Sequence, residues 1–364
     1  MKRKTIIFDA TEAVNPQRRG VGVQTRSWLE VAPFTDYPHL QFVLASKATP
    51  GQESLHVNAS NVKQITHEAR TEEAFIDYLY SLNGDLLFFP LASRQYVRES
   101  KAKMVGVDYG MEDLYCRNYI APLSATEFME WHEYAMQHFD SIITVSKTSQ
   151  RDLAWFFPEY KDKVQVVYPG SVKTGTALEE DMPEVLRGTP YFLVIGYEHK
   201  KNITRIAVAF DAFKQKTGSR TKLAIAGNPG FGGEEIDSHI NSLASAGDIV
   251  RLGYVPAPQK QLLMQHCHAV IALAIYEGFG ISALEGMEAG KIVLVSNNGS
   301  LKEVVGNAGY TANPFSITSI TKQLIFIDGL NDNPKKKYVS NRLAVFDQKL
   351  QTKKLLQHLS KIVA

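Results

Sequence analysis

Residues 269–296 read AVIALAIYEGFGISALEGMEAGKIVLVS and contain, in order, an apolar run, a glycine-punctuated turn, a segment with helical spacing and a second apolar run. This order is typical of two parallel strands joined by a crossover helix. The stretch therefore predicts a strand–helix–strand unit of a parallel sheet. The same alternation extends from it in both directions.

Apolar runs rich in Val, Ile and Phe recur along the whole chain, and helical patterns lie between several of them. One example is TEEAFIDYLYSL from Thr71, in which Phe75, Leu79 and Leu82 recur at steps of four and three residues. The predicted strands begin near Lys4, Leu40, Val62, Asp85, Lys103, Ser141 and Val164, and then near Tyr191, Lys222, Ile249, Ala269, Lys291 and Gly309. These runs predict the α/β class, with two doubly wound, Rossmann-like parallel sheets.

The length of 364 residues favours two domains, because one core seldom grows past about 250 to 300 residues. We expect an N-terminal domain over 1–170 and a C-terminal domain over 190–340. The polar, aperiodic residues 171–189 between them are predicted to be a linker. Residues 341–364 are predicted to form one C-terminal helix that packs back on the N-terminal domain.

Composition excludes several classes of protein. Lys plus Arg number 40 and Asp plus Glu 38, a formal charge of +2, so no strong field recruits nucleic acid. The two cysteines, Cys116 and Cys267, are too far apart for a disulfide scaffold. No apolar run approaches the roughly 18 to 20 residues that span a bilayer. We expect a soluble, cytoplasmic protein, and peripheral association with the inner membrane face is compatible with this.

Three absent motifs narrow the enzyme classes further. There is no phosphate-binding Gly-x-x-x-x-Gly-Lys-Ser/Thr loop and no Gly-x-Ser-x-Gly nucleophile elbow, which disfavours phosphoryl transfer by a P-loop and α/β-type serine hydrolysis. There is also no Asp-x-Asp triplet at a predicted strand end. Any diphosphate leaving group would then be neutralised by lysines and helix dipoles, and we expect no metal and no other cofactor.

The glycine turn after Glu277 is the most informative local feature. Gly278 and Gly280 allow close approach of a ligand to the backbone, and the helix that begins near Gly280 offers N–H groups and partial positive charge to a diphosphate. Glu277 and Glu285 flank this position and suit sugar hydroxyls. A glycine turn with a helix-favouring glutamate explains the same residues without a ligand.

The spacing of Glu277 and Glu285 within EGFGISALEG resembles the signature of family 4 retaining glycosyltransferases, whose GT-B fold has two facing Rossmann-like domains. GYEHKKNITRIAVAF and IVRLGYV, which precede this segment, and SNNGSLKEVVGNAGYTANP, which follows it, occur in the same order as in that family. The resemblance is strong over about residues 191–314. It is weaker in the first half, where it rests on RRGVGVQTRSWLEV and SIITVSKTSQRDL.

The resemblance implies roles for individual residues. Glu277 would touch the donor sugar hydroxyls, Glu285 would hold the ribose, and Lys201 would meet the developing diphosphate. The implied catalytic residues are Glu277, Lys201 and Asp108. The implied donor-binding residues are Gly20, Gly22, Gly196, Lys200, Lys201, Tyr254, Val255, Glu277, Gly278, Phe279, Gly280, Ile281 and Glu285.

Two positions depart from the family pattern. Many members carry a further arginine after the glycine, but here Tyr197 follows Gly196. Family members often have a histidine before the position of Asp108, and here Val107 stands there. Asp108 either borders the acceptor or caps the loop that follows it.

The remaining candidate residues in the first half of the chain can be explained by structural roles as well as by functional ones. The sequence Arg19, Gly20, Val21, Gly22 predicts a glycine loop after the first strand, but it fails as a dinucleotide fingerprint because Thr25 stands at the third glycine position. His132 and His138 lie on a helical stretch without metal-ligand spacing, so we read them as structural.

Together these features predict a metal-independent glycosyltransferase of the hexosyltransferase type, and the resemblance alone implies that it is retaining. It would move a sugar from a UDP- or GDP-sugar to a saccharide or lipid-linked acceptor in cell-surface polysaccharide or glycoconjugate biosynthesis. Two alternatives remain at this point: a nucleotide-sugar epimerase-like enzyme of the same architecture, and a catalytically inactive nucleotide-binding partner subunit.

Overall fold

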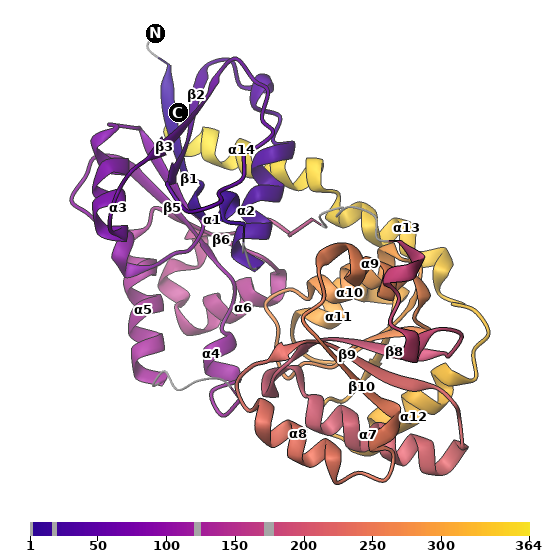
Figure 1. The fold of residues 1–364 in the computed structure, drawn as a ribbon. Coiled ribbons are helices and arrows are strands. Elements are labelled where there is room, and N and C mark those ends of the chain that lie inside the picture. Colours follow the sequence, from indigo (N-terminus) through magenta and orange to yellow (C-terminus); the bar gives the residue numbers. More distant parts are fainter. Residues whose placement is uncertain (1–2, 17–19, 120–124, 171–177) are drawn as a thin grey trace. The chain divides into compact units, whose positions relative to one another are not determined.

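The computed structural model of the chain describes residues 3–16, 20–119, 125–170 and 178–364. The chain divides into two compact units (Figure 1). The first comprises Met1–Met111, Thr126–Val172 and Phe346–Ala364, and the second Glu112–Ala125 and Lys173–Val345. The described residues Glu112–Tyr119, which fall within the expected domain 1–170, therefore belong to the second unit. Residues 171–177 of the expected linker lie outside the described residues.

The first unit is built on a parallel sheet in the order β3-β2-β1-β4-β5-β6-β7. The strands are β1 (Lys4–Asp9), β2 (Leu40–Lys47), β3 (Val62–His67), β4 (Leu86–Phe89), β5 (Lys103–Asp108), β6 (Ser141–Thr144) and β7 (Val164–Val166). The helices are α1 (Thr11–Val14), α2 (Gly20–Val31), α3 (Glu72–Ser81), α5 (Ala125–His138), α6 (Lys147–Phe156) and α14 (Gln348–Val363).

Aromatic side chains fill the core of the first unit. Phe8 on β1 and Phe88 on β4 lie with ring centroids 5.0 Å apart, and Trp28 on α2 meets Phe88 edge to face at 6.3 Å. All three side chains are buried. Because parallel strands are covered on both faces, their sequences read as continuous apolar runs rather than as alternating ones.

The second unit carries a parallel sheet in the order β10-β9-β8-β11-β12-β13. The strands are β8 (Tyr191–Tyr197), β9 (Lys222–Pro229), β10 (Ile249–Gly253), β11 (Ala269–Ala272), β12 (Ile292–Ser296) and β13 (Tyr310–Ala312). The helices are α4 (Glu112–Tyr115), α7 (Ile203–Thr217), α8 (Gly233–Asn241), α9 (Ala257–His266), α10 (Ile281–Glu288), α11 (Gly299–Val305), α12 (Ile317–Asp328) and α13 (Lys336–Leu343).

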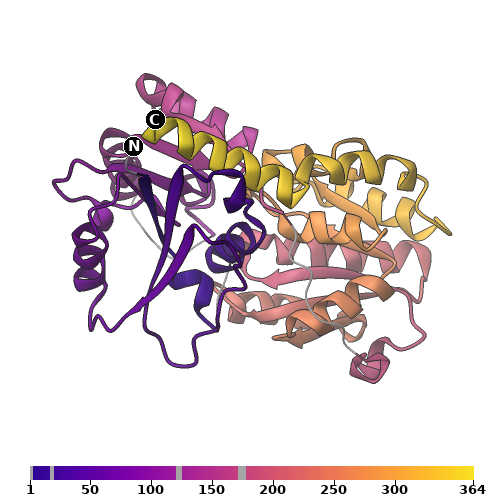
Figure 2. The same ribbon diagram turned by 90° about the horizontal axis from the view of Figure 1, so that it is seen from above.

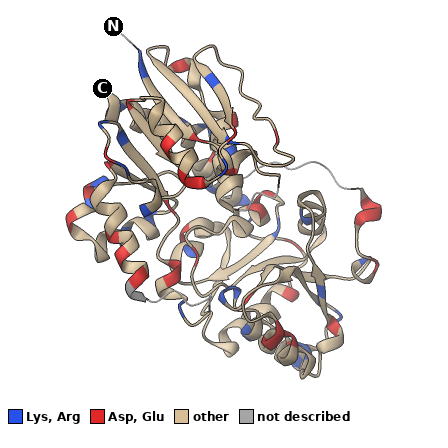
Figure 3. Cartoon of the chain, turned by 60° about the vertical axis from the view of Figure 1, so that its left-hand side comes forward, with Lys and Arg blue, Asp and Glu red and all other residues tan. Residues whose placement is uncertain are grey.

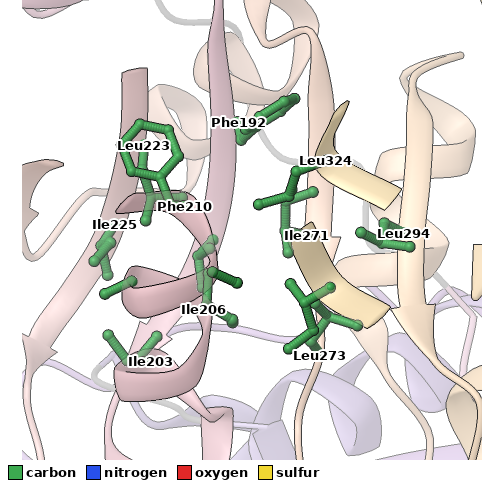
Figure 4. Close-up of a cluster of buried hydrophobic side chains, with 14 of the residues drawn as sticks. Phe192, Ile203, Ile206, Phe210, Leu223, Ile225, Ile271, Leu273, Leu294 and Leu324 are labelled. Carbon is green, nitrogen blue, oxygen red and sulfur yellow. The ribbon is translucent and has the colours of Figure 1, made fainter. Parts of the chain in front are cut away.

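One face of this sheet is covered by α7 and α12. Figure 4 shows Ile206 and Phe210 of α7 and Leu324 of α12 packed over the sheet, where Phe192 and Ile271 stand on neighbouring strands. Each of these five side chains is at most 1% exposed. The stacked apolar residues fix the strands side by side, and this sets where the loops at the strand ends lie.

Every strand expected from the sequence is present, so the prediction of two doubly wound parallel sheets is confirmed. The single helix expected over 341–364 is wrong in detail. Helix α13 ends at Leu343, a 3₁₀ turn follows over Ala344–Phe346, and α14 begins after Asp347. Asp347 caps α14, because its carboxylate accepts the N–H of Leu350 at 2.8 Å.

Helix α14 belongs to the first unit, whereas α13 belongs to the second. Helix α14 packs against α2, and its yellow ribbon can be followed in Figure 2. Gln351 accepts the N–H of Tyr168 at 3.2 Å, and the ring of His358 lies 2.8 Å from the hydroxyl of Ser141. The end of the chain is thus tied to the first unit by hydrogen bonds as well as by apolar packing.

In the cartoon of Figure 3, Lys and Arg residues are interspersed with Asp and Glu residues along the chain. Among the described residues, no helix is both long enough and apolar enough to cross a membrane.

Candidate functional site

Each sheet has a place where the strand order reverses direction, and ligands of doubly wound sheets bind at the carboxyl ends of strands near such a place. In the second unit it lies between β8 and β11. Among the predicted donor residues, Gly196 lies near the end of β8, Lys200 and Lys201 follow that strand, and Glu277 follows β11. The fold therefore brings these two groups to the same edge of one sheet.

Lys201 and Glu277 form an ion pair across this edge, although they are 76 residues apart in the sequence. Their side chains are 23% and 17% exposed, so the pair is partly shielded from water. Gly196 makes room for the lysine, since a Cβ added there would lie 3.0 Å from Cγ of Lys201. Gly196 also has a φ of +100°, which favours glycine.

The turn between Glu277 and α10 is held from α11 and from the loop before it. The hydroxyl of Ser300 lies 2.5 Å from the carbonyl oxygen of Glu277 and 2.8 Å from that of Phe279. The amide of Asn298 donates to the carbonyl of Ile275 at 2.8 Å. Gly280 caps α10 with a φ of +109°. The helix starts at Ile281, as the sequence predicts, and its first N–H groups have no partner within the helix.

Glu285 stands on α10 and pairs with Lys260 on α9, with Nζ and Oε1 2.6 Å apart. Both side chains are largely buried, at 23% exposed for the lysine and 17% for the glutamate. Sequence reasoning singled out Glu285 but missed Lys260, which no motif marks. A lysine at this place neutralises the carboxylate and fixes its direction.

Lys200 points to a different partner from Lys201. Its Nζ lies 2.5 Å from Oε1 of Glu112 on α4 and 3.6 Å from Oε1 of Glu198. Glu112 was also missed by sequence reasoning, because it precedes Lys200 by 88 residues and belongs to no motif.

Tyr254 and Val255 follow β10, next to the end of β9. The side chain of Tyr254 is 71% exposed, and its N–H donates to Oδ1 of Asn228 at 3.0 Å. Val255 packs on the buried cluster beneath. The hydrogen bond that Asn228 accepts and the left-handed Gly253 (φ +65°) hold the loop in place. A contact of this loop with a nucleotide base stays a prediction.

In the first unit, Asp108 ends β5 and both of its carboxylate oxygens are engaged. Oδ1 accepts the N–H of Gly110 at 2.7 Å, and Oδ2 lies 2.9 Å from Nε2 of His132. The capping role considered for Asp108 is therefore present, and an acceptor contact stays a prediction. His132 is a satisfied structural histidine, since its Nδ1 lies 3.0 Å from the carbonyl oxygen of Phe128. Val107 is fully buried.

The glycine loop expected near Gly20 and Gly22 is wrong in form. Helix α2 begins at Gly20, so Gly22 lies in its first turn, buried, and Thr25 donates to the carbonyl of Val21 at 2.9 Å. A Cβ on Gly20 would meet no atom within 4 Å. Arg19 lies outside the described residues. The donor contact expected of the two glycines stays a prediction.

Asp9 is a candidate that sequence reasoning did not single out. It ends β1, next to the reversal of strand order between β1 and β4, and is 2% exposed. Burial raises the pKa of its carboxyl to about 6; hydrogen bonds from Thr11 oppose the shift, and the charges of Glu72 and Glu12 add to it. A buried carboxylate at such a position, with its pKa near neutrality, is typical of functional sites.

We expect Asp9→Asn to stabilise the protein above pH 6 and to leave it unchanged near pH 3.5. The pKa rises from 3.8 to about 6 on folding, so the cost of the buried charge grows through this window and is full above it. The gain at pH 8 should be at most about 3 kcal/mol. The asparagine oxygen can still accept the N–H of Thr11, which lies 3.0 Å from Oδ1. Urea unfolding at pH 3.5 and pH 8 measures the difference. A loss of stability at pH 8 would contradict it.

Within the described ranges, no group of three or more His, Cys, Asp or Glu residues could hold a metal ion. The cations at the candidate site are lysines, Lys200, Lys201 and Lys260, and each has a carboxylate partner. The arrangement can bind an anionic, hydroxyl-rich ligand: lysines meet phosphates, carboxylates meet hydroxyls, and the start of α10 offers backbone N–H groups.

Two doubly wound parallel sheets, with this site at the carboxyl edge of the second, define the GT-B architecture of glycosyltransferases. Solved structures of that architecture match the chain. Sucrose-phosphate synthase from Thermosynechococcus elongatus has a TM-score of 0.73 at 14% identity over 99% of this chain and 100% of its own. Anabaena HepE in complex with UDP and glucose has a TM-score of 0.69 at 17% identity, with the same coverage.

Residues 182–342 match the family model "Glycosyl transferases group 1". O-antigen chain mannosyltransferase B of Escherichia coli is 33% identical over 37% of this chain and 36% of its own length. The alpha-1,3/1,6-mannosyltransferase of Dictyostelium discoideum is 32% identical over 50% of this chain and 47% of its own. The alignments thus span half or less of these two relatives.

Proposed function

We propose that the chain is a retaining hexosyltransferase that moves a sugar from a nucleotide-diphosphate sugar to a saccharide or lipid-linked acceptor. The observation that carries this proposal is the pair of lysine-bound carboxylates, Glu277 with Lys201 and Glu285 with Lys260, that flank the start of α10. The segment that contains all four is matched by the glycosyltransferase family model.

The relatives suggest which sugar to test first. Two of the curated proteins similar to this chain are named mannosyltransferases, one acting on O-antigen chains. We therefore propose mannosyl transfer in the assembly of a cell-surface polysaccharide or glycoconjugate, on the cytoplasmic side of the membrane. GDP- and UDP-sugars are the donors to compare.

The proposed reaction uses the residues of the second unit to hold the donor. Lys201 neutralises the diphosphate as it leaves, which needs no metal ion. Glu277 accepts hydrogen bonds from the sugar hydroxyls and Glu285 from the ribose. Because spacing identifies no carboxylate as a covalent nucleophile, we propose front-face displacement, in which the leaving phosphate helps to take the acceptor proton. The acceptor would bind the first unit, near Asp108.

An inactive nucleotide-binding subunit is the alternative that a specific observation favours. At the position of the family's second cation stands Tyr197, whose hydroxyl donates to Asp237 at 2.6 Å and so serves the packing of the unit. Incubation with GDP-mannose and UDP-sugars plus a panel of saccharide and lipid-linked acceptors tests the proposal. Glycosylated product with the donor's anomeric configuration supports it. Nucleotide binding without transfer to any acceptor favours the alternative, and free nucleotide without acceptor favours neither.

A nucleoside diphosphate should stabilise the protein without added metal, since lysines and the start of α10 supply the positive charge. Ligand at 100 times its dissociation constant should add about 2.7 kcal/mol. Thermal unfolding with UDP, GDP and ADP, each with EDTA and with magnesium, measures this. A stabilisation that appears with magnesium and disappears with EDTA would contradict the metal-independent scheme.

Lys260→Met should raise the Michaelis constant for the donor and leave the turnover number nearly unchanged. The lysine fixes Glu285, whose ribose contact is the same in the ground state and the transition state, so its loss weakens binding uniformly. Steady-state kinetics, together with titration of the bare nucleotide, give the split between the two constants. An equal fall in turnover number would place Lys260 at the reacting centre instead.

A further inference from the structure

The segment after β5 docks on the second unit beside the candidate donor site. The ring of Tyr115 stacks on that of Tyr276, with centroids 4.6 Å apart and planes within 15°. Cys116 is fully buried against Ile275 and Tyr276. Ile275 and Tyr276 directly precede Glu277 in the sequence. Helix α4 is therefore held against the strand end from which the donor loop starts.

A third contact fixes the far end of the same segment. Arg205 on α7 lies with its guanidinium 5.9 Å from the centre of the Tyr119 ring, and its Nη2 is 3.4 Å from the tyrosine hydroxyl. The contacts of Tyr115, Cys116 and Tyr119 restrict the position of Glu112, the first residue of α4. The packing of these residues therefore holds Glu112 against Lys200.

Glu112 places a carboxylate on Lys200, one of the residues that the resemblance implies in donor binding. Its Oε1 lies 2.5 Å from Nζ of Lys200, and the two side chains are 29% and 25% exposed. Burial raises the pKa of Glu112, and the charges of Lys200 and Lys201 oppose that shift. The carboxylate is thus held in a place where a free carboxylate would be costly, and its ion pair with Lys200 favours the charged form.

The charged side chains around Lys200 do not by themselves favour the binding of an anionic ligand at this lysine. Glu112, Glu198 and Glu277 face Lys200 and Lys201, which gives three carboxylates and two ammonium groups, a formal charge of −1. A diphosphate that approaches Lys200 meets a lysine already neutralised. In the proposed complex Glu277 binds the sugar. Glu198 lies 3.6 Å from Lys200 and Glu112 only 2.5 Å, so Glu112 is the carboxylate that competes most directly for this lysine.

Resting on the function proposed above, we infer that Glu112 is an internal counter-anion of Lys200 that competes with the donor diphosphate for this ammonium group. The residue thereby limits the affinity of the site for nucleoside diphosphates. Glu112 lies in the first half of the sequence, outside residues 182–342 that match the family model. The affinity for the donor would therefore depend on a segment that the family model does not cover.

Glu112→Gln tests the inference with little change of shape. The glutamine oxygen can still accept a hydrogen bond from Lys200, but the competing charge is gone. We expect UDP or GDP, whichever the parent protein binds, to bind about tenfold more tightly in isothermal titration. Glu184→Gln is the matched control, because it removes one negative charge from an exposed position of the second unit. It should leave the affinity unchanged.

Lys200→Met in both backgrounds separates competition from a general charge effect. In the parent protein it should weaken nucleotide binding less than about threefold, because Lys200 is already occupied. In the Glu112→Gln background it should abolish the whole gain. Unchanged or weaker binding by Glu112→Gln, or an equal gain by Glu184→Gln, would overturn the inference alone. Failure of the parent to bind any of UDP, GDP, ADP or their sugar conjugates would overturn both the inference and the proposed function.

Discussion

Lys201→Ala is expected to lower the turnover number by a factor on the order of 10² to 10³, and to weaken binding of the bare nucleotide much less. Negative charge on the diphosphate grows as the bond to the sugar breaks, so a cation placed there stabilises the transition state more than the ground state. Loss of one such preorganised contact costs about 3 to 4 kcal/mol of transition-state stabilisation.

The structure adds a second reason to expect a large effect. Lys201 is the ion-pair partner of Glu277, so the alanine variant also leaves that partly buried carboxylate without its cation. Part of the loss would come from a displaced Glu277 rather than from the diphosphate. Lys201→Ala in a Glu277→Gln background separates the two contributions, because the effects of contacting residues do not add.

Steady-state kinetics and isothermal titration with the bare nucleotide measure the outcome. Lys216→Ala is a suitable control, since Lys216 is an exposed lysine in the last turn of α7. It should behave as the parent protein. A Lys201→Ala variant with normal turnover would show that the lysine serves only to fix Glu277, and would move the diphosphate away from it.

The sheets could be predicted from the sequence because strands buried on both faces leave an unmistakable apolar run. The end of the chain could not be predicted equally well. Leucines and lysines suit a helix on both sides of Ala344–Phe346, and only the capping of α14 by Asp347 shows where a new helix begins. Local spacing marks helical residues but does not reveal a break that tertiary packing imposes.

The residues of the candidate site also fall into those that could be predicted from the sequence and those that could not. Glu277, Glu285 and Lys201 stand in segments whose spacing carries a signal, and the sequence singles them out. Glu112 and Lys260 carry none, because an ion pair between distant residues leaves no periodic trace. Asp108 and His132 were both considered from the sequence, yet their contact at 2.9 Å arises only when β5 and α5 are brought together.

Glu277→Gln and Glu285→Gln are expected to fail in different ways, because the two carboxylates meet different parts of the donor in the proposed complex. Glu277 contacts sugar hydroxyls whose directions change as the ring flattens. Its glutamine variant should lower the turnover number by a factor on the order of 10². The affinity for the bare nucleotide, which has no sugar ring at this place, should remain nearly that of the parent.

Glu285→Gln should weaken binding of the bare nucleotide by about 1.5 to 3 kcal/mol, the typical worth of a charge-assisted hydrogen bond. The ribose does not react, so its contacts are the same before and during the reaction, and their loss raises the Michaelis constant more than it lowers the turnover number. The Lys260 ammonium would then lack its carboxylate, and Lys260→Met should reproduce the same pattern.

Titration with nucleotide and steady-state kinetics on both variants decide the placement of the donor. Glu234→Gln, at an exposed position on α8, controls for the loss of one charge. If Glu277 governed nucleotide affinity and Glu285 only turnover, the donor would have to lie in the opposite direction along α10. The diphosphate would then no longer contact Lys201, and the ion pair between Lys201 and Glu277 would serve only to stabilise the structure.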